Sequence, residues 1–280
     1  MLGRMQPAGA FRQVELDVDG FPERLTVARD GAVWFTDPQG GRIGRVFPDS
    51  NKADYYSVPT PKSGPASIAA ARDGSIWFTE HAADQIAMLV PAGANRPSSG
   101  ENGFKEFALP LGGGPAGIAA AADGSLWFAE NSGNRIGRIE LAQNADQPVI
   151  VEYPLPVARS HPNSVAVGGD GDVYFTELAS SRIGRITPQG QISEIELPVA
   201  GPALDIVADG EGTIWITVPR AHAICRLRPG TAIATFNLPP TAIPAFIVGG
   251  TDGNLYFTEP TGKIARFTPA GVLTEFKLAD

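Results

Sequence analysis

The sequence contains very little cysteine and histidine, and fewer basic than acidic residues. Of its 280 residues, one is cysteine and three are histidine, and 22 Lys or Arg stand against 30 Asp or Glu. The single thiol, Cys225, cannot form an intrachain disulfide, and its Ala-Ile-Cys-Arg-Leu setting indicates a small buried side chain. The net charge of −8 disfavours contact with a phosphate backbone. We therefore expect no nucleic-acid partner.

Long apolar runs are also missing. Residues Met1–Pro7 contain no run that suits a signal peptide, and no stretch approaches the roughly 20 apolar residues of a membrane-spanning helix. We expect a cytoplasmic protein without a membrane partner. The 43% hydrophobic content is enough for the core of one large all-β domain over residues 1–280, with residues 1–10 expected to be disordered.

An internal repeat is the dominant feature of the sequence. A segment of the type Asp-Gly-x-x-Trp-Phe-Thr-Glu occurs six times, with its aromatic residues about 41 to 50 residues apart. The Asp-Gly pair indicates a tight hairpin turn, and the aromatic, β-branched residues after it favour a buried strand. Each repeat is interpreted as four strands, which is typical of a propeller blade. The segments begin at Asp30, Asp73, Asp123, Asp170, Glu211 and Asp252.

Six complete repeats predict an all-β, six-bladed β-propeller of four-stranded blades. One observation leaves a seven-bladed alternative open. Residues 11–16 resemble an additional fourth strand, close in type to residues 274–278. Either one terminal strand is peripheral, or a seventh blade is incomplete.

Residues that recur in every blade are best explained by the fold, whereas a site for one ligand must break the symmetry. An acid ends the aromatic strand in five of the six repeats. We interpret these acids as structural, each paired with an arginine or backbone N–H of a neighbouring blade, because buried carboxylates need such partners. They are Asp37, Glu80, Glu130, Glu177 and Glu259.

The three histidines do not belong to the repeat. His81 directly follows a strand-end acid, His161 precedes the proline of the fourth repeat, and His222 lies in a turn of the fifth. Imidazole can act as a general base near neutral pH or bind a metal, although a solvated loop histidine without a task is more common.

The residue after each repeat proline and the residue after each strand-end acid are expected to face the mouth of the central channel. Polar side chains at these places concentrate in blades two to four. The candidate catalytic residues are His81, Asn131, His161 and Asn163, supported by Glu80 and Glu130. A merely hydrated channel mouth is the alternative interpretation.

The repeat motifs carry a resemblance to a known family. Gly-Pro-x-x-Ile, Asp-Gly-x-x-Trp-Phe-Thr-Glu and Arg-Ile-Gly-Arg-Ile-Thr recur from Phe11 to Asp280, and the chain resembles the virginiamycin B lyases, or streptogramin lyases. The resemblance implies a β-propeller that linearises cyclic depsipeptides by elimination, with a histidine base, acidic residues and Mg²⁺. It also implies a catalytic histidine after the proline of the last blade, where this chain has Ala245.

Two functions follow as hypotheses. The first is a lyase that opens a cyclic ester or lactone held at the channel mouth, with His81 or His161 as base and Glu80 or Glu130 as ligands of a Mg²⁺ ion that only the resemblance implies. The second is a non-catalytic propeller that binds a peptide or metabolite. A sensor module of the NHL type is a third interpretation, without a membrane anchor or effector domain to support it. A spare edge strand also predicts a homodimer.

Overall fold

The computed structural model describes residues 2–6, 9–14, 20–48, 52–91, 103–141 and 147–278. Two compact units divide the chain, Met1–Glu152 and Tyr153–Asp280, and each is described by itself. Within the described residues, the elements are β-strands apart from the 3₁₀ turn η1 (Pro219–Ala221).

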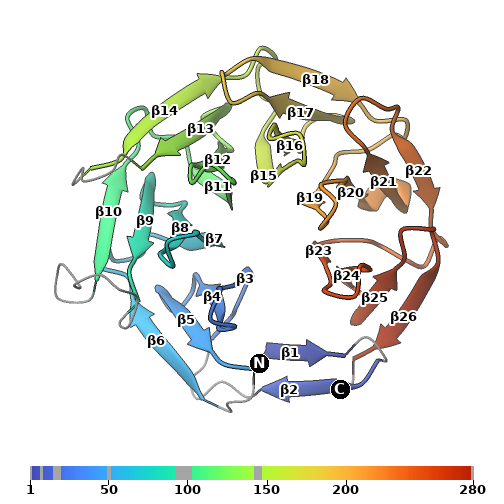
Figure 1. Ribbon diagram of the computed structural model, residues 1–280, viewed down its shortest axis with the longest axis horizontal. Helices are drawn as coiled ribbons and strands as arrows, with labels where there is room; N and C mark the ends of the chain where they lie inside the picture. The colour runs from blue at the N-terminus through green and yellow to red at the C-terminus, as the bar shows by residue number, and fades with distance from the viewer. Residues whose placement is uncertain are drawn as a thin grey trace. The chain divides into compact units, whose positions relative to one another are not determined.

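The first unit contains the hairpin of β1 (Leu2–Met5) and β2 (Phe11–Val14), followed by blades one to three. Each blade is a four-stranded antiparallel sheet whose strands pair in chain order (Figure 1). The outer strand of blade three crosses the boundary between the units. The strands are β3 (Leu25–Val27), β4 (Val33–Asp37), β5 (Arg42–Val46) and β6 (Ala53–Ser57); β7 (Pro65–Ala70), β8 (Ile76–Glu80), β9 (Gln85–Leu89) and β10 (Phe104–Ala108); and β11 (Pro115–Ala120), β12 (Leu126–Glu130), β13 (Arg135–Glu140) and β14 (Val149–Pro154).

The second unit contains blades four to six, built in the same way. The described chain thus forms six four-stranded sheets, which confirms the predicted class of a six-bladed β-propeller. The strands are β15 (Pro162–Val167), β16 (Val173–Glu177), β17 (Arg182–Ile186) and β18 (Ile192–Glu196); β19 (Asp205–Ala208), β20 (Ile214–Val218), β21 (Ala223–Leu227) and β22 (Ala234–Asn237); and β23 (Ile247–Gly249), β24 (Leu255–Glu259), β25 (Lys263–Phe267) and β26 (Leu273–Lys277).

The two terminal strands that left the blade count open take different places. Strand β26 is the fourth strand of blade six, whereas β2 pairs with β1 in a separate two-stranded sheet. The strand expected at residues 11–16 is therefore outside the blade sheets over its described part; residues 15 and 16 lie outside the described residues. Strand β1 also shows that part of the segment expected to be disordered is a strand.

The Asp-Gly turns form for the reason that the sequence suggests. In blade two, Gly74 has a φ of 87°, which glycine adopts without a steric cost. The carboxylate of Asp73 accepts a hydrogen bond from the backbone N–H of Ser75 at 3.0 Å, and the Ser75 hydroxyl accepts one from the indole of Trp77 at 2.9 Å. The turn therefore also positions the aromatic residue of the next strand.

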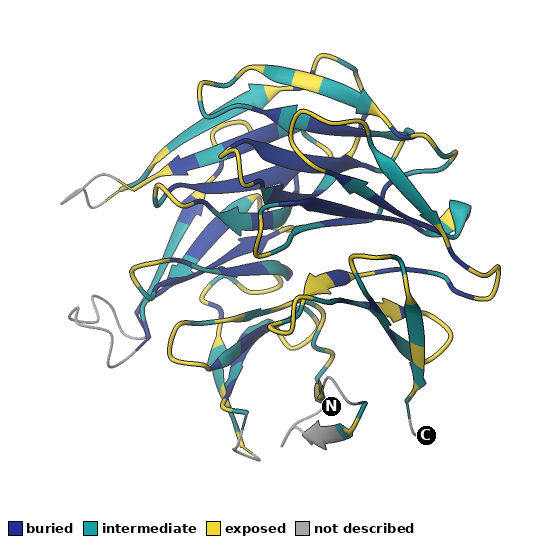
Figure 2. Ribbon diagram, turned by 45° about the vertical axis from the view of Figure 1, so that its right-hand side comes forward, coloured by how far each residue is buried: buried dark blue, intermediate teal, exposed yellow. Residues whose placement is uncertain are grey.

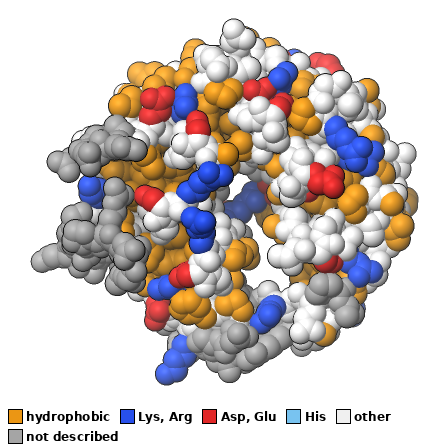
Figure 3. All heavy atoms as spheres, viewed as in Figure 1, with side chains coloured by type: hydrophobic (Ala, Val, Ile, Leu, Met, Phe, Trp, Pro, Cys, Tyr) orange, Lys and Arg blue, Asp and Glu red, His pale blue; other side chains and the backbone are white. Residues whose placement is uncertain are grey.

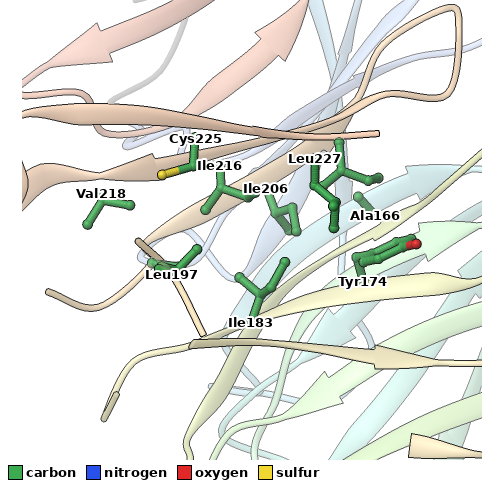
Figure 4. Close-up of a cluster of buried hydrophobic side chains, with 11 residues drawn as sticks. Ala166, Tyr174, Ile183, Leu197, Ile206, Ile216, Val218, Cys225 and Leu227 are labelled. Carbon is green, nitrogen blue, oxygen red and sulfur yellow. The ribbon is translucent and has the colours of Figure 1, made fainter. Parts of the chain in front are cut away.

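The core lies in the second strands of the blades. In four of the six, every residue of this strand is buried (Figure 2). Figure 4 shows a cluster in the second unit, where Cys225 packs near Ile216 and Val218. Cys225 is fully buried and burial raises its pKa to about 11, so the expectation of a small buried side chain is confirmed.

Charged side chains of both signs are interspersed over the face drawn in Figure 3. In the part of the chain that the structure describes, no helix has the length and apolar character needed to cross a membrane.

Candidate functional site

The strand-end acids are buried and mostly paired. Arg42 Nε lies 2.8 Å from Asp37 Oδ2, and Arg135 Nε lies 2.7 Å from Glu130 Oε2. Each arginine begins the third strand of the acid's own blade, so the predicted pairing with a neighbouring blade's arginine was wrong for these acids. The antiparallel register explains this, because Asp37 is directly opposite Arg42 and Glu130 opposite Arg135. The same arrangement places Arg182 Nε 3.4 Å from Glu177 Oε2 and sets Lys263 opposite Glu259.

Two blades depart from this pairing. Blade five replaces both partners by apolar residues, Val218 and Ala223, which are directly opposite each other. Blade two keeps the acid, Glu80, but has Gln85 in place of the base. Glu80 is completely buried, and neither carboxyl oxygen has a hydrogen-bond partner among the described residues. Burial raises the pKa of Glu80 to about 7, the negative charge of Glu106 adds to the shift, and the nearby hydroxyl of Ser63 opposes it.

The imidazole of His81 has one fixed and one available nitrogen. Its Nδ1 lies 3.2 Å from the carbonyl oxygen of Pro115 in the next blade. A carbonyl only accepts hydrogen bonds, so this contact requires the proton of a neutral imidazole to be on Nδ1. Nε2 then keeps its lone pair, and the residue is exposed. His81 therefore has the tautomer that a general base at Nε2 needs.

Gly114 makes room for this ring. A Cβ at Gly114 would lie 2.9 Å from Cε1 of His81 and 2.9 Å from Oγ of Ser132, so a larger residue would displace the imidazole. The backbone of Gly114 is left-handed, with a φ of +62°, which also favours glycine. Its carbonyl accepts the backbone N–H of Asn131 at 3.1 Å. Two of the predicted site residues, His81 and Asn131, therefore both lie next to Gly114.

Asp84 belongs to this cluster and was missed in the sequence. Its Oδ1 accepts the backbone N–H groups of Gly113 at 2.8 Å and Gly114 at 2.7 Å. These hydrogen bonds, together with the charges of His81 and Arg135, lower the pKa of Asp84. The signal that could have identified it is its place, four residues after a strand-end acid.

The position four residues after the end of the second strand, which Asp84 occupies in blade two, also links neighbouring blades in the second unit. Ser181 Oγ accepts the N–H of Gly201 at 2.8 Å, and Nδ1 of His222 lies 3.0 Å from the carbonyl oxygen of Ala242. His222 therefore links blades five and six through the same kind of contact that His81 makes between blades two and three.

His161 and Asn163 lie in the second unit, at the start of blade four. His161 is exposed with a left-handed φ of 53°, and its carbonyl accepts the N–H of Leu178 at 3.1 Å. The amide Nδ2 of Asn163 donates to the carbonyl of Leu204 at 3.4 Å. These two residues and the pair His81 and Asn131 are in different units, and each pair is described alone.

The predicted metal ligands do not fit a shared Mg²⁺ ion. The carboxylate of Glu130 already holds Arg135 and is fully buried. Burial and the neighbouring Glu152 raise the pKa of Glu130, against the effect of Arg135. Among the described residues, no three acidic, histidine or cysteine side chains gather as a ligand group. Mg²⁺ remains an expectation from resemblance, and no catalytic step is derived from it.

The blade architecture defines a β-propeller, and comparisons with known proteins define its family. The model of the virginiamycin B lyase family matches residues 101–280. The structure of virginiamycin B lyase from Staphylococcus aureus is 32% identical, with a TM-score of 0.83, over 94% of this chain and 86% of that chain. A streptogramin B lyase structure is 31% identical, with a TM-score of 0.85, over 96% of this chain and 87% of that one.

The chain belongs to the virginiamycin B lyase family. A catalytically inactive histidine-to-alanine variant of the Staphylococcus aureus lyase, determined with quinupristin, is 32% identical with a TM-score of 0.82, over 93% of this chain and 85% of that chain. Comparison with curated protein sequences gives no match.

Proposed function

We propose that this protein is a carbon–oxygen lyase that opens the ester ring of a cyclic depsipeptide, with His81 as the general base. Family membership supports the reaction class, since relatives are virginiamycin B and streptogramin B lyases. The observation that carries the residue assignment is the contact between His81 Nδ1 and Pro115 O, which leaves Nε2 as a proton acceptor. We expect the protein to act in the cytoplasm.

Elimination needs one base and a leaving carboxylate. The base removes a proton from the carbon adjacent to the carbon that bears the ester oxygen. The released electron pair forms the carbon–carbon double bond, and the carbon–oxygen bond breaks so that the ring opens to a free carboxylate. A neutral imidazole accepts this proton without a metal ion or water. Asn131 supplies an amide that can hydrogen-bond the substrate's ester carbonyl.

The acids of the cluster have supporting roles. Asp84 accepts the N–H groups of Gly113 and Gly114, and the absence of a side chain at Gly114 leaves the space that the His81 ring needs. The carboxylate of Asp84 also stabilises the imidazolium that forms when His81 takes up the proton. His161 and Asn163 remain proposed site residues and are a second candidate base and amide.

Turnover of quinupristin by purified variants tests this proposal. We expect His81→Ala to lower kcat at least about 100-fold, as for loss of a general base, and His161→Ala to test the second candidate. His222→Asn is the matched control, because His222 has the same contact between Nδ1 and a carbonyl but no proposed catalytic role. Equal activity of wild type, His81→Ala and His161→Ala would refute the assignment of both bases.

A non-catalytic binding propeller is the second candidate. Ala245, where the family places a catalytic histidine, has no group that can transfer a proton. It is 8% exposed, its N–H donates to Thr258 O at 2.9 Å, and its carbonyl accepts from Thr217 Oγ1 of blade five at 2.8 Å, so its backbone joins the start of blade six to blade five. Calorimetric binding of quinupristin without any ring opening would favour this function.

A further inference from the structure

We propose that blade two contains a binding site for a small hard cation at the buried carboxylate of Glu80, in the place where other blades carry an arginine or lysine side chain. The proposed ligands are the oxygen atoms of Glu80, Gln85 and Ser63, with Glu106 as a second carboxylate beside them. This ligand set lies within one blade and differs from the Glu80 and Glu130 pair considered above.

The strand-end acids of the other blades face a basic residue, whereas Glu80 does not. Asp37, Glu130 and Glu177 each form an ion pair with the arginine five residues later, and Lys263 stands opposite Glu259. Where the base is absent in blade five, the acid is absent too. Glu80 is the one strand-end acid that faces a neutral partner, Gln85.

A second observation concerns the buried oxygen atoms at this position. Glu80 is 0% and Ser63 1% exposed. Both carboxyl oxygens of Glu80 and Oε1 of Gln85 are buried, and no described residue reaches them with hydrogen-bond geometry. The buried hydroxyl of Ser63 lies beside Glu80, where its interaction with the carboxylate lowers the pKa of Glu80. Leaving such groups unsatisfied costs about 1–3 kcal/mol each, and more for a charge. A single cation in contact with these oxygens would satisfy all of them.

The negative charges of Glu80 and Glu106 also favour a cation at this position. Glu106 lies close enough for its charge to act on Glu80, and the N–H and hydroxyl of Thr60 donate to its two oxygens at 2.9 and 2.8 Å. Lys62, adjacent to Ser63 in the chain, is exposed, and no ion pair to Glu80 is found among the described residues. Two carboxylates with neutral oxygens are a ligand set for Ca²⁺, which takes carboxylate, amide and hydroxyl oxygens in flexible geometry. Mg²⁺ also prefers oxygen ligands but demands a closer, octahedral arrangement.

Thermal unfolding of chelator-treated protein, with and without Ca²⁺ or Mg²⁺, tests the proposal. We expect the midpoint of the wild type to rise with each tenfold increase in the concentration of at least one of these cations, because a ligand that binds only the folded state stabilises it. Gln85→Arg gives blade two the acid–arginine pair that blade three has between Glu130 and Arg135, and Glu80→Gln removes the negative charge of the carboxylate. Both variants should lose the cation response.

The control is Glu211→Gln, which removes one charge at an exposed turn residue and should keep the response of the wild type. The proposal is overturned if no cation raises the wild-type midpoint, or if Glu80→Gln responds as the wild type does. A further result would overturn it: a midpoint that falls as pH rises from 4.5 to about 7, equally with and without cations, and that no longer falls in Glu80→Gln. A proton would then neutralise Glu80 instead of a cation.

Discussion

Asp205 provides the sharpest test of how the blades of the second unit are held together. Its Oδ1 accepts the hydroxyl of Ser164 from blade four at 2.6 Å, and its Oδ2 accepts the backbone N–H of Ile247 from blade six at 2.9 Å. Asp205 is only 3% exposed. One carboxylate thus connects three consecutive blades, and its removal should destabilise the unit strongly.

The magnitude follows from the two bonds. A hydrogen bond to a charged group contributes about 1.5–3 kcal/mol, so Asp205→Ala should lower the free energy of unfolding by about 3–6 kcal/mol. Urea unfolding followed by tryptophan fluorescence measures this, because Trp215 is buried in the same blade. In a double-mutant cycle with Ser164→Ala, the coupling should be about 1–3 kcal/mol.

The control is Asp252→Ala. Asp252 also accepts several hydrogen bonds, from Asn254 and from the Tyr256 hydroxyl at 2.8 Å, but it is exposed, and its loss should cost about 1 kcal/mol or less. If Asp205→Ala costs no more than Asp252→Ala, or if the cycle shows no coupling to Ser164, the inference that this carboxylate joins the blades is refuted.

Three further predictions concern packing, pH and association. Gly137→Ala would place a Cβ 2.0 Å from Cζ of Phe128 and should cost about 1–3 kcal/mol in urea unfolding, whereas Gly210→Ala, with no atom within 4 Å, should cost less. Burial raises the pKa of Glu177 in the folded state, so this group stabilises the fold below its ordinary pKa and that contribution is lost as pH rises through the raised value; urea titrations at several pH values should show a weaker fall for Glu177→Gln. Among the described residues, strand β2 (Phe11–Val14) pairs with β1 and with no other strand. We expect its other edge to support a homodimer; sedimentation as a monomer at all concentrations would contradict this.

Much of the fold could be predicted because its determinants are local. Asp-Gly turns and alternating strands specify one blade, and repetition specifies the architecture. The partners of the acids were less accessible, since the choice between the same blade and a neighbouring blade depends on strand register. Glu130 and Arg135 are five residues apart in sequence and directly opposite in the sheet, and that short spacing could have indicated the pairing.

The candidate site could be predicted only in part. The departure of His81 and Asn131 from the repeat identified them as candidates. The tautomer of His81 could not be inferred, because it depends on a carbonyl 34 residues away in the next blade. Asp84 was missed because its role depends on a loop of the following blade, at Gly113 and Gly114.

Substitutions within the repeat show which residues depend on each other. Gly137 lies opposite Phe128, and blade five changes both members of this pair, to Cys225 and Ile216. The same blade also changes both members of the ion pair. When both partners change, no buried charge is left unpaired. When only one partner changes, a buried charge remains without its counter-charge, and breaking a buried pair by removing one partner costs about 3–5 kcal/mol. The single change at Gln85 therefore calls for a compensating partner at Glu80, and a bound cation provides one.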